Sequence, residues 1–524
     1  MFNRYTFILL ASLIAGQSAT ADVDFNPLSD DKPSYLQSIP LLLSLQNINA
    51  QNQLSTPHVQ ELNNKYQVRS LFAESKSLPM VDIQLTFNAG AARDEEIAPG
   101  LYGIANMAAK LIDEGTENYT ANDIARAFER VGAQFSAQAY RDMFIVKLRV
   151  LSDPKKLEPA VAMMLKVLNH STFKKSSINL VLSNTQVGQK QIQESPSRMM
   201  NIMFYRALYG KHPYAQPIPG TQGSISKISS EQLQRFSQQF LVSQNLNIAI
   251  TGKLNSKEAL KLSEQIAGNL KQGEKAKALA QPVEKTSFDI RHIKFKSSQA
   301  HVMMGQLGTT RFDPDRLALE VANQMFGGSG FNSILMQELR VKRGYTYGAY
   351  SSFSFSQAPG SFSFSYSTQQ DQLLDSIKIA HQALVNFVNQ PIDKNKMQDT
   401  KAGMLRAFPN NYNSNAHINA QLGSIGFYNQ SANYLSIYPQ LLEKITAQDV
   451  QNAIRKHLHP ERLTIIVVSD QFDKKALEAL LKQNLAPQFP IPNKEQIPKS
   501  VIAPPEKPVT DERAVFPDDV PASI

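Results

Sequence analysis

The sequence predicts an α+β protein of two homologous domains, each with helices packed on a mainly antiparallel sheet. A length of 524 residues exceeds what one hydrophobic core usually holds. The second observation is a long repeat. "ISSEQLQRFSQQFLVSQNLNIAITG" begins at Ile228 and resembles "ITAQDVQNAIRKHLHPERLTIIVVS" from Ile445, an offset of 217 residues. "DIQLTFNAG" ends at Gly90 and resembles "AHVMMGQLG", which ends at Gly308, an offset of 218. A near-constant offset at both ends of the unit indicates duplication of a whole domain.

Local patterns place helices and strands in both halves. "NDIARAFERVG" predicts an amphipathic helix that ends at Gly132, and apolar alternation over 144–150 predicts a strand. In the second half, "FSFSQAPGSFSFSY" predicts a hairpin that turns at Pro359-Gly360. Each copy of the repeat reads as a capping Ser or Thr, an amphipathic helix, and a strand of alternating apolar residues.

Composition sets the expected boundaries. Residues 1–21 have a basic start, a short apolar run and Ala19-Thr20-Ala21, which is the layout of a secretory signal peptide. Residues 22–64 predict an irregular lead-in, and the polar stretch 271–286 predicts a linker between domains over 65–270 and 287–485. The last segment, 486–524, holds nine prolines in 39 residues and predicts a disordered tail.

The bulk properties exclude several functions. The chain has no cysteine, which excludes disulfides, thiolate nucleophiles and Cys-ligated zinc. Its formal charge of +9 is scattered, without a dense basic run, so nucleic-acid binding is not expected. No segment after the signal peptide approaches the ~20 apolar residues of a membrane span. We therefore expect an exported protein of the bacterial periplasm.

One short stretch carries the functional signal. In "GIANMAAKLIDEGT", from Gly103, a set of apolar residues recurs at helical spacing and predicts a buried face. The members of this set are Ile104, Met107, Ala108 and Leu111. Asn106, Ala109 and Lys110 share another face, at i, i+3 and i+4. A metallopeptidase helix of the H-x-x-E-H type has two zinc-binding histidines and a catalytic glutamate at this spacing.

This stretch belongs to a series of motifs. It follows "LPMVDIQLTFNAGAARDE" and precedes "ALYGKHPYAQPIPGT". In this order the motifs resemble the insulinase/pitrilysin family of zinc peptidases, and most closely its bacterial and mitochondrial-processing-peptidase branch. The resemblance extends from Val68 to Leu485. It implies two such domains that together form half of a clam-shaped chamber.

The sequence departs from that family at the metal. Asn106 and Lys110 stand at the two histidine positions, Ala109 at the glutamate position, and Val187 where the resemblance implies the third ligand. Asparagine is a weak zinc ligand, alanine cannot accept a proton, and an ammonium group repels Zn²⁺. We therefore expect no zinc and no other cofactor in this chain. The remaining close pair, His457 and His459, is interpreted as a polar corner in preference to a ligand pair.

Other motifs of the family are kept in "MFGGSGFNSILMQELRVKRGYTYGAYS". The resemblance implies that Arg340 and Tyr347 close over a peptide and stabilise the charge on its carbonyl oxygen. Alternatively, Arg340 interacts with a helix macrodipole and Tyr347 packs in a strand. The resemblance also implies substrate binding by the glycine-rich segment with Gly327, Gly328 and Gly330. Alternatively, its first two glycines simply end a helix.

These observations predict the non-catalytic, substrate-binding subunit of a heterodimeric zinc metallopeptidase that degrades or processes peptides. A zinc-bearing insulinase-family subunit would be its partner and would supply the metal. Two alternatives stay open. One is a peptide-binding or scaffold protein without a catalytic partner, and the other is a hydrolase with an unrecognised site.

Overall fold

The computed structural model describes residues 56–485, and it omits the side chains of 185–187 and 189–193. The predicted signal peptide, most of the lead-in and the tail 486–524 therefore lie outside the described residues. The described residues, 56–485, belong to one compact unit. None of the helices within 56–485 is both long and apolar enough to cross a membrane.

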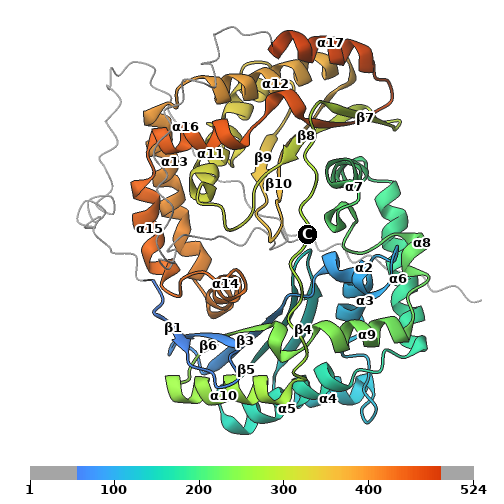
Figure 1. Cartoon of the computed structure of the whole chain (residues 1–524), viewed down its shortest axis with the longest axis vertical. Helices are drawn as coiled ribbons and strands as arrows, with labels where there is room; N and C mark the ends of the chain where they lie inside the picture. Colours follow the sequence, from blue (N-terminus) through green and yellow to red (C-terminus); the bar gives the residue numbers. More distant parts are fainter. Residues whose placement is uncertain (1–55, 486–524) are drawn as a thin grey trace, which may run out of the picture. The chain divides into compact units, whose positions relative to one another are not determined.

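The first sheet has six strands (Figure 1). In spatial order they are β1 (Val59–Leu62), β2 (Arg69–Glu74), β6 (Leu246–Gly252), β3 (Met80–Phe87), β5 (Phe144–Leu151) and β4 (Gln134–Ala139). Only the β2–β6 pair is parallel. β1 differs from the irregular lead-in expected over 22–64, because Val59–Leu62 pair with β2 and complete the sheet edge.

The second sheet repeats this plan with five strands. Their order is β7 (Asp289–Lys294), β11 (Thr464–Ser469), β8 (Gln299–Leu307), β10 (Ser361–Gln369) and β9 (Ala349–Phe353). Here only the β7–β11 pair is parallel, and it corresponds to the β2–β6 pair of the first sheet. The order β2-β6-β3-β5-β4 thus recurs as β7-β11-β8-β10-β9, which confirms the predicted α+β class and its two related, mainly antiparallel sheets.

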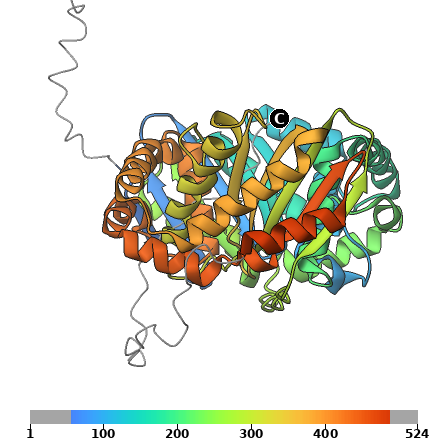
Figure 2. The ribbon, with the colours of Figure 1, turned by 90° about the horizontal axis from the view of Figure 1, so that it is seen from above.

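Helices follow the same two halves. The first half contains η1 (Ala91–Arg93), α2 (Asp94–Ile97), α3 (Ile104–Leu111), α4 (Ala121–Arg130), α5 (Pro154–His170), α6 (Lys175–Gln193), α7 (Pro196–Tyr209), η2 (Pro213–Ala215), α8 (Gln222–Ile225), α9 (Ser230–Phe240), η3 (Ser243–Asn245) and α10 (Ser256–Asn269). The second contains α11 (Arg316–Gly327), the π-helical turn η4 (Met336–Val341), η5 (Gln370–Gln372), α12 (Leu373–Asn389), α13 (Lys394–Ala407), η6 (Phe408–Tyr412), α14 (Asn415–Phe427), α15 (Tyr434–Lys444), α16 (Ala447–His457), η7 (Pro460–Arg462) and α17 (Lys474–Leu485). Seen from above in Figure 2, the orange and red helices of the second half lie across its strands.

The predicted helix signals are present. Ser229 and Thr446 begin α9 and α16 with reciprocal capping boxes, in which the side chain three residues later binds the cap's own N–H. Gly132 follows α4 at a φ of +65°, a left-handed conformation that a residue with a Cβ rarely adopts. Between α10 and β7, the chain over 271–286 forms neither helix nor strand.

The two halves exchange helices. α7, from the first half, packs on β8 and β11, whereas α14, from the second half, packs on β2, β3 and β6 (Figure 1). This exchange corrects one prediction. From the apolar alternation in the sequence, buried and exposed residues should alternate along β6 and β11. Instead, all of β11 and nearly all of β6 are buried, because helices cover both faces of these central strands.

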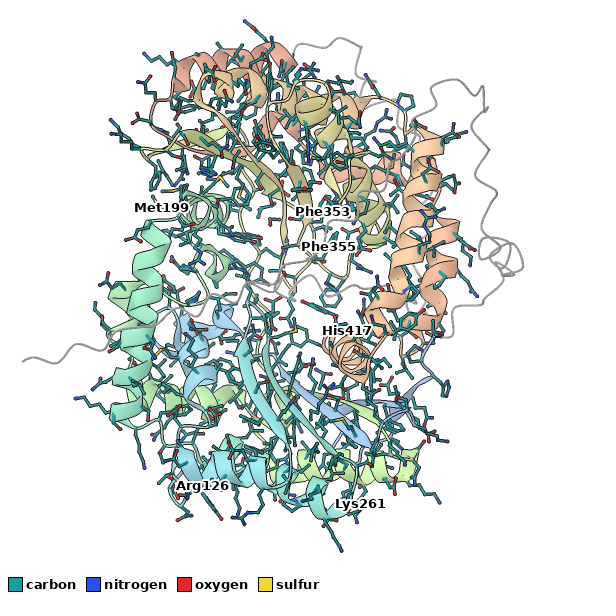
Figure 3. All side chains as sticks on the ribbon, turned by 180° about the vertical axis from the view of Figure 1, so that it is seen from behind. Arg126, Met199, Lys261, Phe353, Phe355 and His417 are labelled. Atoms are coloured by element: carbon teal, nitrogen blue, oxygen red, sulfur yellow. The ribbon has the colours of Figure 1, made fainter. Side chains whose placement is uncertain are left out.

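The predicted hairpin pairs β9 with β10, and Phe353 lies opposite Phe362. Phe355 comes after β9 ends, in the loop, and stacks on Phe353 with ring centroids 5.4 Å apart. Figure 3 shows both rings close together at the end of the strand. Gly360 is needed in this loop, since a Cβ there would lie 1.7 Å from the Ser354 carbonyl oxygen.

Candidate functional site

Helix α3 is anchored at its N-terminus by a buried carboxylate. Asp94 accepts hydrogen bonds from the backbone N–H of Gly103 at 2.7 Å and of Ala105 at 2.8 Å. Burial raises the pKa of Asp94 to about 7, although these N–H groups act in the opposite direction. The predicted apolar face of α3 is completely buried. The helix is therefore held in place without any metal ligand.

The other face of α3 carries the three substituted positions together, as the spacing predicts. Asn106 is half-buried, Ala109 is 6% exposed, and Lys110 is exposed. Among the described residues, no acceptor binds the buried Nδ2 of Asn106. An amide, a methyl group and an ammonium group do not form a zinc site. α6 packs against α3 and contains Val187, the expected position of a third ligand, whose side chain is not described.

Elsewhere in 56–485, three potential metal ligands converge at Asp313, Asp315 and His457. His457 Nε2 lies 3.0 Å from Asp315 and 3.6 Å from Asp313. The ammonium group of Lys456 lies 2.6 Å from the same Asp315 oxygen. Burial acts to raise the pKa of the Asp315 carboxyl, but the hydrogen bonds from Lys456 and His457 outweigh it and lower that pKa below its usual value. The Lys456 ammonium group and the His457 ring thus already bind this carboxylate, which disfavours a further cation.

The two histidines of the polar corner face different carboxylates. His459 Nδ1 lies 3.6 Å from Glu461, whereas His457 faces the aspartates. They do not form a ligand pair. Sequence reasoning missed the aspartates, although an Asp-Pro-Asp run directly before a helix was a visible signal of a carboxylate cluster.

Arg340 and Tyr347 are linked by a hydrogen bond from the Arg340 side chain to the Tyr347 backbone. Arg340 lies in the last turn of η4, and its Nη1 donates to the carbonyl oxygen of Tyr347 at 2.6 Å. Its guanidinium also lies 4.5 Å from the ring centroid of Phe331. The alternative interpretation of Tyr347 as a packed strand residue is wrong, because the residue precedes β9 and is 85% exposed.

The glycines divide into two kinds. Gly327 ends α11, and a Cβ there would lie 2.6 Å from the backbone nitrogen of Ser351. A Cβ at Gly328 would lie 2.7 Å from the Cα of Gln324. Both positions thus fit the alternative in which glycine ends a helix in close packing. Gly330 differs, with a φ of +111° and open space around its Cα.

A cavity of about 940 Å³ lies beside this glycine-rich segment. Residues of α11, α13 and the loop 328–333 line it, and Phe353, Phe355 and Phe408 contribute aromatic rings. No sequence pattern pointed to it, because its lining residues come from separate parts of the second half.

The fold and the α3 geometry define a class: a two-domain chain with the architecture of a zinc peptidase and substitutions at the metal-binding positions. The model of the insulinase family, peptidase family M16, matches residues 70–222, and that of the peptidase M16 inactive domain matches 227–404. The chain belongs to the insulinase family.

Its relatives include members described as inactive. It is 32% identical to a Pseudomonas fluorescens structure titled peptidase M16 inactive domain, with a TM-score of 0.75, covering 79% of this chain and 99% of that one. It is 22% identical to the Helicobacter pylori non-peptidase homolog YmxG, over 79% of this chain and 94% of the relative. An uncharacterized zinc protease of Rickettsia bellii is 27% identical, over 52% of this chain and 66% of the relative. The chain is thus similar both to family members named zinc proteases and to members described as inactive or non-peptidase.

Proposed function

We propose that this chain is the non-catalytic, substrate-binding subunit of a heterodimeric zinc metallopeptidase. The observation that carries the proposal is α3, which keeps its capped start and buried face while Asn106, Ala109 and Lys110 occupy the metal-binding positions. A zinc-bearing insulinase-family subunit supplies the metal and the general base. This chain supplies part of the clam-shaped chamber in which a peptide is bound.

Arg340 and Tyr347 are this chain's contribution to the reaction. The Arg340 guanidinium uses Nη1 for the Tyr347 carbonyl and has further N–H donors on Nε and Nη2. The Tyr347 side chain is exposed and can donate through its phenol. Two such donors, aimed at the carbonyl oxygen of the scissile bond, stabilise its developing negative charge. Gly330 gives the neighbouring loop conformational freedom to approach a peptide.

We also propose that the protein is exported to a bacterial periplasm. The support is the sequence of residues 1–21, which lie outside the described part of the chain.

Reconstitution tests the proposal. The purified chain and its zinc-bearing partner, each inactive alone, should hydrolyse peptides when mixed. A scaffold protein without a catalytic partner would co-purify with no zinc-bearing relative. A hydrolase with its own site would be active alone and would resist chelators.

A further inference from the structure

The cavity between α11 and α13 has an apolar floor. We call it the α11–α13 groove, and its floor consists of Phe353, Phe355 and Phe408, all nearly completely buried. Phe353 and Phe355 stack on each other, and Figure 3 shows the two residues close together. A floor of aromatic rings suits apolar, compact side chains, including the pyrrolidine ring of proline.

Two buried polar groups lie at the same cavity. Ser333, only 5% exposed, has no hydrogen-bond partner for its Oγ among the described residues. Glu320 accepts a hydrogen bond from Arg316 Nη1 on one oxygen, while its Oε2 has no partner in 56–485. Burial raises the pKa of Glu320, and Arg316 opposes the shift. An unsatisfied buried polar atom costs about 1–3 kcal/mol, so the wall of the cavity carries two destabilising polar atoms.

The rim of the groove is rich in amides and carboxylates. Gln324, Asn332 and Asn410 are exposed there, and each amide can both donate to and accept from a peptide backbone. Asp393 and Asp399 add negative charge. This combination fits an extended segment whose carbonyl groups are not used internally, as in a polyproline II helix.

We propose that the α11–α13 groove binds a proline-rich extended segment, and that the segment is the chain's own residues 486–524. This segment contains nine prolines and follows α17 directly. At ~3.1 Å per residue, 39 residues of polyproline II reach ~120 Å, so the groove is within range. The first part of the segment, 486–499, carries Lys494, Lys499 and Glu495, a net charge of +1. It complements a rim with Asp393, Asp399 and Lys396, a net charge of −1. The proposal is independent of catalysis by any partner.

Disulfide trapping in the full chain tests it, since the natural sequence has no cysteine. Ser500→Cys is combined with Asn332→Cys or Asn410→Cys at the rim, or with Gln483→Cys at the end of α17. An undocked segment would cross-link fastest to Gln483→Cys, because that loop is the shortest. A docked segment raises the effective concentration at the groove. We expect at least one rim pair to form about tenfold faster than the Gln483 pair. The reverse order would overturn the proposal.

A charge reversal and a competitor give a second, independent test. Asp399→Lys should slow rim cross-linking, whereas Glu129→Lys on α4, an equally exposed reversal far along the chain, should not. A synthetic peptide of residues 486–510 added in excess should also slow it. Rim cross-linking that is insensitive to both the peptide and Asp399→Lys would show random encounter and would contradict docking.

Discussion

Replacing Arg340 separates a structural from a catalytic role for this residue. Arg340→Ala removes the charged hydrogen bond to the Tyr347 carbonyl and the contact with the Phe331 ring. Hydrogen bonds to charged groups contribute about 1.5–3 kcal/mol when buried, and solvent reduces that at this exposed site to about 1 kcal/mol. The cation–π contact adds roughly 0.5–1 kcal/mol. The loop 341–348 should thus lose about 1–2 kcal/mol of local stability.

Two assays follow from these magnitudes. A loss of about 1–2 kcal/mol corresponds to roughly 5–30-fold faster hydrogen exchange at Gly344 and Tyr345, whose amides bind Arg340 and Leu339 carbonyls. In the reconstituted peptidase, loss of one oxyanion donor should lower turnover by ~10²–10³. The catalytic loss therefore exceeds what loosening of the loop explains.

Arg343→Ala is the matched control. Arg343 lies in the same segment and binds Glu338 at 2.8 Å, but it does not occupy the position that matches the family's motif. Its removal should leave turnover within about threefold of the parent. If Arg340→Ala speeds exchange but leaves turnover unchanged, Arg340 only holds the loop, and the assignment of an oxyanion donor is refuted.

Four further outcomes are expected. Lys110→Ala should leave turnover of the reconstituted enzyme nearly unchanged. An inactive Lys110→Ala variant would indicate that catalytic residues lie in the first domain of this chain. Gly423→Val should lower the free energy of unfolding by about 1–3 kcal/mol, since a Cβ there lies 2.0 Å from Gln84 Nε2, and urea melts measure this. Because burial raises the pKa of Asp94 from 3.8 to about 7, its contribution to stability is complete below pH 4 and is lost as the pH rises through 7. Asp94→Asn should flatten that slope in pH-dependent unfolding. Limited proteolysis of the described part of the chain should cut first within Lys271–Lys285, while early cuts in α9 would contradict the predicted domain boundaries.

Local signals in the sequence predicted much of the fold. The offset repeat predicted two sheets of the same strand order, and cap residues such as Ser229 and Thr446 predicted where helices begin. The buried face of α3 followed from helical spacing alone. Each of these features depends on residues close together in the chain, which is why a single sequence sufficed.

Features built from distant segments could not be predicted. β6 and β11 are buried on both faces because α7 and α14 are exchanged between the two sheets. No local sequence pattern indicates this exchange. The α11–α13 groove joins Phe355 to Phe408, which look like ordinary core residues in the sequence. Tyr347 is exposed because it lies in the loop between the end of η4 and the start of β9.

Metal analysis of the complex isolated from its native host tests whether the zinc belongs to a partner subunit and not to this chain. This chain, carrying an affinity tag, is purified at low salt, and native mass spectrometry identifies the bound chains and their metal. We expect a heterodimer with a zinc-bearing insulinase-family subunit and one zinc, which stays with that subunit when the two are separated. One tightly bound zinc on this chain alone, lost on changing Asn106 or Lys110, would contradict it.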